Sequence, residues 1–393
     1  MIEKKLVPKR RFEGFEDEWE QQQLKYIYNA IRNAFVGTAT PYYVNSGHFY
    51  LQSNNVKDGK INRNTEVFIN NDFYEKQKDK LLRTGDLVMV QSGHVGHTAV
   101  IPKELDKTAA HALIMFQGYK KEVSPYFLNY QFQTNKVKKR LNGITTGNTI
   151  EHILASDMEI FEVNTASIKE QQKIGEFFKR LDEMIELEQR KINKTKALKN
   201  AYLAEMFPAE GERVPKRRFE GFTDEWIPFK LKDLIVSEEK GNARADMLGH
   251  NSLYLDANFL NGGAPVYINS LTNVKEDDVL ILWDGSHAGK VYHGFKGALG
   301  STLKALKPLE SGGFIYYFLY FNQKKIFEQY RTPNIPHVIN TFTDEFMICK
   351  PSLEEQLKIS GFFKKIDYII ETHKQKLEKL KAIKQAYLHE MFV

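Results

Sequence analysis

The side chains best suited to chemistry lie in short polar loops. His94 and His97 stand three residues apart in a glycine-rich stretch, a spacing that two ligands of a metal ion could have. Because no Asp, Glu or further His is close to them in the sequence, we expect no metal there. Two basic Lys-Arg-Arg triplets, which begin at Lys9 and Lys216, could contact phosphate groups. Alternatively, they form solvated faces beside packed aromatic residues.

No catalytic motif is present in the sequence. It has no GxxxxGK[ST] phosphate loop, no Asn-Pro-Pro-aromatic methyltransferase motif, and no HExxH, GxSxG or CxxC motif. We therefore expect the chain to have no catalytic activity of its own. An enzyme of unrecognised type, with one catalytic domain, is the alternative, and it predicts a deep pocket of perturbed titratable groups in one half only.

Composition indicates folded domains and only weakly a polyanionic partner. The chain has 393 residues, which predicts two or three domains, and 42% hydrophobic with 12% aromatic residues, enough for real cores. The net charge is +6. The single Cys349 excludes an intramolecular disulfide or a Cys-rich zinc site, and its apolar neighbours predict a buried thiol. No span of 18 apolar residues and no signal-like segment occurs, so we expect a soluble, cytoplasmic protein.

The element that must position the loops is a long helix that occurs twice. Residues 167–207 align without a gap to residues 352–392, at an offset of 185 residues. Each copy repeats apolar residues at steps of four and three, so each predicts a rod of roughly 60 Å at 1.5 Å per residue. Such a seam must be buried, and the other copy is the nearest partner. The residues predicted to form the seam in the two copies are Ile174, Phe178, Leu181, Ile185, Ile192, Tyr202, Met206, Ile359, Phe363, Ile366, Ile370, Leu377, Leu380, Tyr387 and Met391.

Polar residues interrupt both seams at matching positions. Glu188 corresponds to His373, and Lys199 corresponds to Lys384, while Thr195 adds a break in the first copy. The simpler interpretation is that the seam is wet there. The alternative is that these residues fix the register of the helices, as a buried polar residue can.

A second repeat opens each half of the chain. Residues 7–19 and 214–226 differ only at Glu16 and Thr223. Phe12, Phe15 and Trp19 recur at helical spacing, so we expect a short docking element in each half.

The two segments between a docking element and a long helix share the same predicted order of elements but differ in sequence. In the first, β-prone runs at residues 49–51, 67–69 and 87–90 alternate with turn residues, a helix is expected over 124–140, and a polar loop over 143–148. In the second, residues 278–283 predict a buried strand, a helix is expected over 314–330, and a polar loop over 331–337. His152 and His337 align across the repeat. Because the helices match and these segments diverge, the segments are expected to do one kind of job on different targets.

The whole chain resembles the specificity (S) subunit of a Type I restriction-modification enzyme. The resemblance rests on the duplicated helices with Ala201-Tyr202-Leu203 and Ala386-Tyr387-Leu388, and on the KRRFEGF openings. The stretch from Gly37 to Pro41 with Gly47 is similar to the family's first recognition segment, and Gly85-Asp86 with Gly93 and Gly96 is similar to its strand-and-glycine turn, as is the stretch from Asp278 to Gly289. Residues 241–263 depart from the family pattern because they lack its Thr-Pro feature.

This resemblance implies an α+β fold with two mixed α/β target recognition domains in tandem. Two long helices that form an antiparallel coiled coil would separate them, with pseudo-two-fold symmetry. The expected domains are a first recognition domain at 1–166, a first helix at 167–207, a linker at 208–213, a second recognition domain at 214–351 and a second helix at 352–393.

The resemblance also implies the function. Each variable domain would read one half of a bipartite site in double-stranded DNA, and the paired helices would set the spacer. Two modification (methyltransferase) subunits would dock, and restriction subunits would join them; S-adenosylmethionine, ATP and Mg are expected on those partners and no cofactor in this chain. A coiled-coil adaptor that does not bind DNA is the alternative, and it predicts unchanged DNA affinity when basic loop residues are neutralised.

Base readout needs hydrogen-bonding and cationic side chains in the loops. The first segment offers Tyr42, Tyr43, Gln52, Asn54, Asn55, Lys57, Arg63, His94, His97, Thr146 and Asn148. The second offers Lys240, Arg244, Ser286, His287, Lys290, Ser301, Thr302, Asn334 and His337. Glycines at 93, 96, 285 and 289 are expected to form tight turns.

Overall fold

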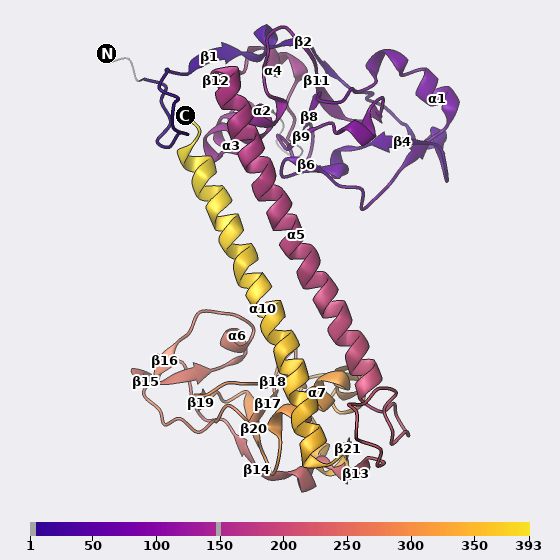
Figure 1. Ribbon diagram of the computed structural model, residues 1–393, viewed down its shortest axis with the longest axis vertical. Helices are drawn as coiled ribbons and strands as arrows, with labels where there is room; N and C mark the ends of the chain where they lie inside the picture. The colour runs from indigo at the N-terminus through magenta and orange to yellow at the C-terminus, as the bar shows by residue number, and fades with distance from the viewer. Residues whose placement is uncertain (1–4, 147–150) are drawn as a thin grey trace. The chain divides into compact units, whose positions relative to one another are not determined.

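Figure 1 shows the fold as a computed structural model, which describes residues 5–146 and 151–393. The described chain forms two compact units. Unit 1 contains the residues up to Glu188 together with residues 376–393, and unit 2 contains residues 189–375. Both contain sheets and helices, which confirms the expected α+β class with two mixed domains in tandem.

Two long helices contribute to both units (Figure 1). Helix α5 spans Ile168–Met206, and helix α10 spans Leu353–Glu390. Both are rich in Leu, Lys, Glu, Gln and Ala and contain no Pro, and each has one glycine, in its first turns, so helix is the favoured conformation throughout.

The two helices pair antiparallel within each unit, as expected. In unit 1, Asp182 of α5 binds Lys384 of α10, while Glu188, further along α5, binds Lys376, which comes earlier in α10. In unit 2, Lys199 binds Asp367, and the Tyr202 and Phe362 rings lie edge to face, 5.1 Å apart. The residues of the predicted seam are buried, apart from the half-buried Ile185, Tyr202 and Tyr387.

The seam is dry at three of its polar positions. Glu188, Lys199 and Lys384 are only 2%, 6% and 8% exposed. Lys384 Nζ lies 2.8 Å from the Asp182 carboxylate, and Lys199 Nζ lies 2.6 Å from the Asp367 carboxylate. The wet-seam interpretation is therefore wrong for these positions. A buried charge needs its partner, so these pairs favour the alternative that polar residues fix the helix register.

Each buried pair also holds a tyrosine of the neighbouring domain. Tyr130 donates a hydrogen bond to Asp182 over 2.9 Å, and Tyr317 donates one to Asp367 over 2.8 Å. The ammonium groups of Lys384 and Lys199 lie 5.3 and 5.2 Å from the two tyrosine ring centres. One Lys–Asp–Tyr cluster therefore ties both long helices to the domain in each unit.

The β-prone runs of the first segment form strands in the sheets of unit 1, as predicted. The main sheet is antiparallel, in the order β2 (Tyr28–Asn33), β11 (Leu113–Tyr119), β8 (Leu87–Val90) and β9 (Thr98–Val100). A second sheet runs β10 (Ala109–Ala110), β4 (His48–Leu51), β7 (Phe68–Ile69) and β3 (Tyr43–Val44). Two pairs complete the set: β1 (Glu20–Gln23) with β12 (Glu162–Thr165), and β5 (Val56–Lys57) with β6 (Lys60–Ile61).

The single helix predicted over 124–140 is two helices. α2 spans Pro125–Phe132 and α3 spans Asn135–Asn142. Thr134 between them accepts a hydrogen bond from the Val137 amide, so it caps a new helix and does not continue the first. The remaining helices of unit 1 are α1 (Asn71–Glu75) and α4 (Ala155–Ile160), with short 3₁₀ helices at Leu24–Tyr26, Thr40–Tyr42, Ser53–Asn55, Lys78–Lys80 and Lys103–Leu105.

Unit 2 repeats this plan. Its main sheet is antiparallel, in the order β14 (Ile235–Lys240), β20 (Leu303–Pro308), β17 (Val279–Leu282) and β18 (Val291–His293). A second sheet runs β16 (Tyr267–Ile268), β15 (Leu248–Leu255) and β19 (Ala298–Leu299), and β13 (Ile227–Lys230) pairs with β21 (Met347–Lys350). The predicted buried strand at 278–283 is confirmed as β17. Cys349 in β21 is half-buried, less enclosed than predicted, and burial raises its pKa.

The helix predicted over 314–330 is also two helices, α7 (Gly312–Phe321) and α8 (Gln323–Gln329). They meet at Asn322, whose backbone lies outside the helical region. Unit 2 also has α6 (Ala257–Leu260), α9 (Phe342–Glu345) and a 3₁₀ helix at Leu231–Leu234.

The docking elements are not helical, although their aromatic residues recur at helical spacing. Residues 7–19 and 214–226 form loops with turns at Gly14 and Gly221, where φ is +88° and +91°. Trp19 is nevertheless buried against Phe127 and Phe392, and Trp226 against Phe207 and Phe314. The aromatic residues dock as expected, but from an irregular backbone.

Candidate nucleic-acid interface

Polar loops gather at one edge of the main sheet in unit 2. The chain leaves β17 at Trp283, turns through Gly285 and Gly289, and re-enters the sheet at Lys290. Both glycines have positive φ, +111° and +92°, as expected for tight turns. A Cβ at Gly289 would lie 3.0 Å from the Ile326 side chain, so this turn also packs closely on α8.

A second loop is bonded directly to this turn. The Gly285 amide donates to the Pro336 carbonyl over 2.9 Å, and the Val338 amide donates to the Trp283 carbonyl over 2.9 Å. Arg331 adds a bond from its guanidinium to the Ser286 carbonyl over 3.1 Å. The loops at 283–290 and 331–338 therefore form one surface, which carries Ser286, His287, Asn334 and His337.

The edge of β20 and the end of β14 join the same surface. The amides of Trp283 and Asp284 both donate to the Thr302 carbonyl, and the Ser301 amide donates to the Ala243 carbonyl. Lys240 forms an ion pair with Asp284 over 3.4 Å. The residues predicted in the second segment thus meet in one loop cluster, defined here as residues 240–244, 283–290, 301–302 and 331–338.

Unit 1 has the corresponding cluster. The Gly93 amide donates to the Glu151 carbonyl over 3.3 Å, and the Ile153 amide donates to the Gln91 carbonyl over 3.0 Å. His152 pairs with Ser92 and Thr146, as His337 pairs with Asp284. His94, His97 and Thr146 belong to this cluster, and Lys57 lies beside it because the Asp58 amide donates to His97 Nδ1 over 3.2 Å.

The other predicted residues of the first segment lie around its second sheet. Tyr43 accepts a hydrogen bond from Gln52 over 2.7 Å, and the Tyr42 ring stacks on Phe73 with ring centres 4.1 Å apart. Arg63 lies over the Phe49 ring, 4.8 Å from its centre, and pairs with Glu66. Asn54 is exposed and donates to Thr65. The first segment therefore offers two groups of candidates.

One predicted contact residue is wrong. Asn55 is 1% exposed, and its amide is used inside the loop. Its oxygen accepts from the Gln52 amide, and its nitrogen donates to the carbonyls of Asn62 and Thr65. Asn55 therefore shapes the 52–65 loop and is removed from the DNA-binding candidates. Asn148 lies outside the described residues.

Comparison with known proteins identifies the family. The sequence profile described as "Type I restriction modification DNA specificity domain" matches residues 16–197 and 223–382. The chain belongs to this family. The resemblance seen in the sequence is thereby confirmed, and with it the role of a DNA specificity subunit that is not itself catalytic.

Two specificity subunits of Methanocaldococcus jannaschii are similar to the chain. The MjaVIII subunit is 31% identical over 193 residues, which cover 46% of this chain and 43% of that protein. The putative MjaX subunit is 20% identical over 395 residues, which cover 95% of this chain and 92% of that protein. The longer match is thus the more distant one.

Solved structures share the fold. A Type I restriction-modification S subunit from M. genitalium superposes with a TM-score of 0.72 at 16% identity, covering 99% of both chains. A chain from a study of complex assembly and conformational transition of the Type I R-M system has a TM-score of 0.53 at 16% identity, covering 96% of this chain and 98% of that one.

Three further polar residues near the candidate DNA-binding residues were not predicted from the sequence. Arg331 is bonded to the 283–290 loop, and Lys304 lies 3.5 Å from the centre of the Trp283 ring. His111 corresponds to Gly300 in the strand register, because each forms the isolated parallel bridge that precedes β11 or β20. The Nε2 atom of His111 lies 3.0 Å from the Gly37 carbonyl oxygen.

His94 and His97 lie in the turn between β8 and β9. The described residues contain no group of three His, Cys, Asp or Glu side chains that could hold a metal ion. His97 Nδ1 accepts the Asp58 amide, and burial lowers the pKa of this histidine. The ring is therefore held neutral, with its other nitrogen as a donor.

The basic triplets are used inside the molecule. Arg11 binds Glu170 at the start of α5 with two hydrogen bonds of 2.9 and 2.7 Å, and Arg218 binds Glu355 at the start of α10 with the same two distances. Arg10 and Arg217 pair with Glu390 and Glu205 near the helix ends. These four arginines hold the docking elements on the helices, which favours the structural interpretation over phosphate contact for them.

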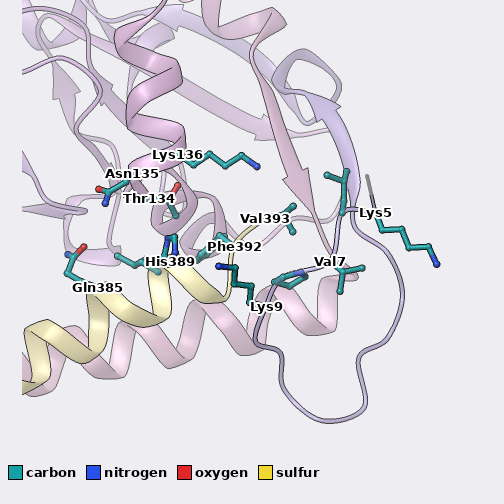
Figure 2. A pocket seen from close by; sticks show the side chains of 13 residues that line it. Lys5, Val7, Lys9, Thr134, Asn135, Lys136, Gln385, His389, Phe392 and Val393 are labelled. Carbon is teal, nitrogen blue, oxygen red and sulfur yellow. The ribbon is translucent and has the colours of Figure 1, made fainter. Parts of the chain in front are cut away.

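A cavity of about 430 Å³ in unit 1 lies among the docking element, the start of α3 and the end of α10 (Figure 2). Lys5, Lys9, Lys136 and His389 line it together with Phe392. It contains none of the predicted DNA-binding residues. Among the helices of the described chain, none is long and apolar enough to cross a membrane.

Proposed function

We propose that the two variable domains of this specificity subunit each read one half of a bipartite DNA site, through the loop clusters described above. One observation carries the proposal: the two domains differ in sequence, yet in both a loop that follows the third strand of the main sheet is hydrogen-bonded to a second polar loop at the same edge of that sheet. Two domains that recognise different DNA sequences need the same backbone arrangement of these loops but different side chains on them.

The side chains of the unit 2 cluster suit this role. Lys240, Arg244, Lys290 and Arg331 supply cations for phosphates or guanine edges, and Ser286, His287, Asn334 and His337 supply hydrogen-bonding groups. Asp284 pairs with Lys240, and Asp246 pairs with Arg244 over 3.2 Å, so two of these four cations already have a carboxylate partner that DNA would have to displace. In unit 1, Lys57, His94, His97 and Thr146 are the corresponding candidates, with Tyr42, Tyr43, Gln52, Asn54 and Arg63 as a second group.

We further propose the domain division expected from the sequence, with recognition domains at 1–166 and 214–351. The long helices at 167–207 and 352–393 set the spacer between half-sites, and residues 208–213 link the halves. Rigid helices suit this role because half-sites a helical turn apart, roughly 34–36 Å, need a fixed separation.

The remaining partners follow from the family. Two modification (methyltransferase) subunits dock on the assembly, and restriction subunits join them. S-adenosylmethionine, ATP and Mg belong to those partners.

An exchange of one recognition segment tests the proposal. Residues 20–165 are replaced by the corresponding segment of a family member with a different known target, and the methylated motif is read by sequencing the host genome. We expect one half-site to change and the other to stay. If both half-sites changed, the modular reading would be wrong.

A charge test separates the specificity role from a DNA-free adaptor. Replacing Lys57, Arg63, Arg244 and Lys290 with Ala removes cations from both candidate surfaces. DNA affinity of the assembled complex should fall and its salt dependence should become shallower. The matched control replaces Lys324, Lys358, Lys379 and Lys381, which lie on exposed helix faces. Unchanged affinity in the first variant would favour the adaptor.

A further inference from the structure

A groove of about 760 Å³ lies in unit 2, between α10 and the domain. The helix side is formed by residues of α10 from Leu357 to Lys374, and the domain side by the end of β18, α6 and α7. Four carboxylates and two lysines line it, so it is net acidic: Asp277, Glu310, Asp367, Glu371, Lys364 and Lys374.

Unit 1 shows what fills the matching place. Glu186 of α5 corresponds to Glu371 of α10 by the sequence repeat, and Asp182 corresponds to Asp367. The hairpin of β5 and β6 carries Lys60 onto this part of α5, where its ammonium donates to the Asp182 carbonyl over 3.3 Å and lies 3.9 Å from Glu186.

The hairpin is held there by α2. Asn129 donates to the Gly59 carbonyl over 2.9 Å, and a Cβ at Gly59 would lie 2.1 Å from the Gln133 side chain. Only a glycine turn fits so closely against the helix. In unit 1, then, a lysine on a tight turn covers the acidic helix face.

Unit 2 keeps the acidic face and lacks that hairpin. Tyr317 corresponds to Tyr130, since each bonds the matching aspartate, so Tyr316 stands where unit 1 has Asn129. Tyr316 stacks on His293 and lines the groove, and Tyr368 on α10 is 74% exposed. Glu371 bonds Lys374 and Gln375 of its own helix. The groove thus presents carboxylates beside the exposed ring of Tyr368 and the half-buried ring of Tyr316.

We propose that this groove binds a segment of a partner subunit that presents a lysine next to an apolar side chain, in the way that Lys60 covers α5 in unit 1. The lysine pairs with Glu371, and the apolar neighbour packs on Tyr316 and Tyr368. Asp367 and Glu310 are neutralised by Lys199 and Lys350. The exposed carboxylates of Glu371 and Asp277 still disfavour DNA as the occupant, because they repel phosphate. The proposal rests on the proposed role of the chain in a multisubunit complex.

Carbodiimide crosslinking tests the contact, because it joins a carboxylate to a lysine only when they touch. The chain is assembled with its modification subunits, treated, and analysed by peptide mass spectrometry. We expect a link between the α10 peptide that carries Glu371 and a lysine of a modification subunit, lost in Glu371→Gln and retained in the matched unit 1 variant Glu186→Gln. A link to a second copy of this chain, or to Lys374 alone, would overturn the proposal.

Assembly affinity gives an independent measurement. Glu371→Lys and Tyr368→Ala change side chains that are largely exposed, so both variants should fold. We expect each to weaken binding of the modification subunits about tenfold, chiefly by faster dissociation, and Glu186→Lys to change it by less than about twofold. Equal effects of Glu371→Lys and Glu186→Lys would contradict a groove specific to unit 2.

The same preparations separate this inference from the proposed function. A complex that protects both DNA half-sites but gives no Glu371 crosslink would overturn the groove alone. A complex that gives the crosslink but binds no bipartite DNA would overturn DNA readout alone.

Discussion

At the scale of single residues, the arrangement depends on a few buried charges. Asp182 accepts hydrogen bonds from Tyr130 and Lys384, and Asp367 accepts them from Tyr317 and Lys199. In each unit these three side chains come from three different elements. Any other arrangement of these elements would leave the aspartate without its lysine and tyrosine, which costs free energy, so the cluster favours one arrangement.

Removing one member of the cluster should be expensive. Lys384→Met leaves the Asp182 carboxylate buried without its cation, and we expect a loss of about 3–5 kcal/mol in the free energy of unfolding. Lys384→Met with Asp182→Leu should recover most of it, because no unpaired charge remains. Denaturant unfolding measures both. Lys381→Met, whose ion pair is exposed, serves as the control and should cost less than about 1 kcal/mol.

His293 should make stability depend on pH. Burial lowers its pKa below 6.5, so the unfolded chain binds the proton more readily than the folded chain. Asp277 and Asp278 oppose the shift and Lys364 reinforces it. The histidine therefore costs no stability above pH 6.5, and destabilises as the pH falls from 6.5 through the folded pKa. The fall in melting temperature between pH 7.5 and 5.5 should be smaller in His293→Asn. An equal fall in both proteins would rule this out.

At the scale of elements, the sequence predicted types better than boundaries. The heptad spacing predicted the two long helices and a buried seam, and the family resemblance implied their antiparallel pairing. The breaks at Thr134 and Asn322 were missed because apolar spacing continues across them, and only capping by Thr134 reveals the first. The spacing of Phe12, Phe15 and Trp19 predicted a docking element but not its backbone, since an irregular loop can carry aromatic residues at the same spacing as a helix.

The candidate site was predictable only in part, for the same reason. Residue types and turn glycines located the loops at 93–97 and 285–290. Asn55 looked the same as Asn54 in the sequence, yet only one of them faces outward. His111 and Arg331 join the clusters through strand register and loop-to-loop bonds, which no local pattern encodes.

The docking elements should detach selectively. Arg218→Ala removes two charge-assisted hydrogen bonds to the buried Glu355, and Arg11→Ala does the same to Glu170. We expect faster amide hydrogen exchange across residues 214–226 in the first variant and across 7–19 in the second, with the other element unchanged. Lys216→Ala, beside these arginines, should change neither. Faster exchange in both elements of either variant would show that they are coupled.

At the scale of the whole molecule, the repeated helices are proposed to set the distance between half-sites. Inserting one heptad into α5 directly after Glu188 and one into α10 directly before Lys376, two residues that face each other, keeps the seam contacts on both sides in register. We expect the methylated motif to keep both half-sites and gain a longer spacer. The same insertion in one helix only should prevent assembly, because its partner seam would be out of register. An active complex with an unchanged spacer would remove the helices from this role.

The composition of unit 1 has a consequence for synthesis on the ribosome. Its core includes Trp19 and Phe127 from early in the chain, and Leu388 and Phe392 from residues 376–393. Unit 2 is continuous, so its residues leave the exit tunnel as one block. Unit 1 is translated first, but the apolar residues of its core that pack on α10 stay uncovered until residues 376–393 emerge. It therefore completes its fold after unit 2, which is translated second.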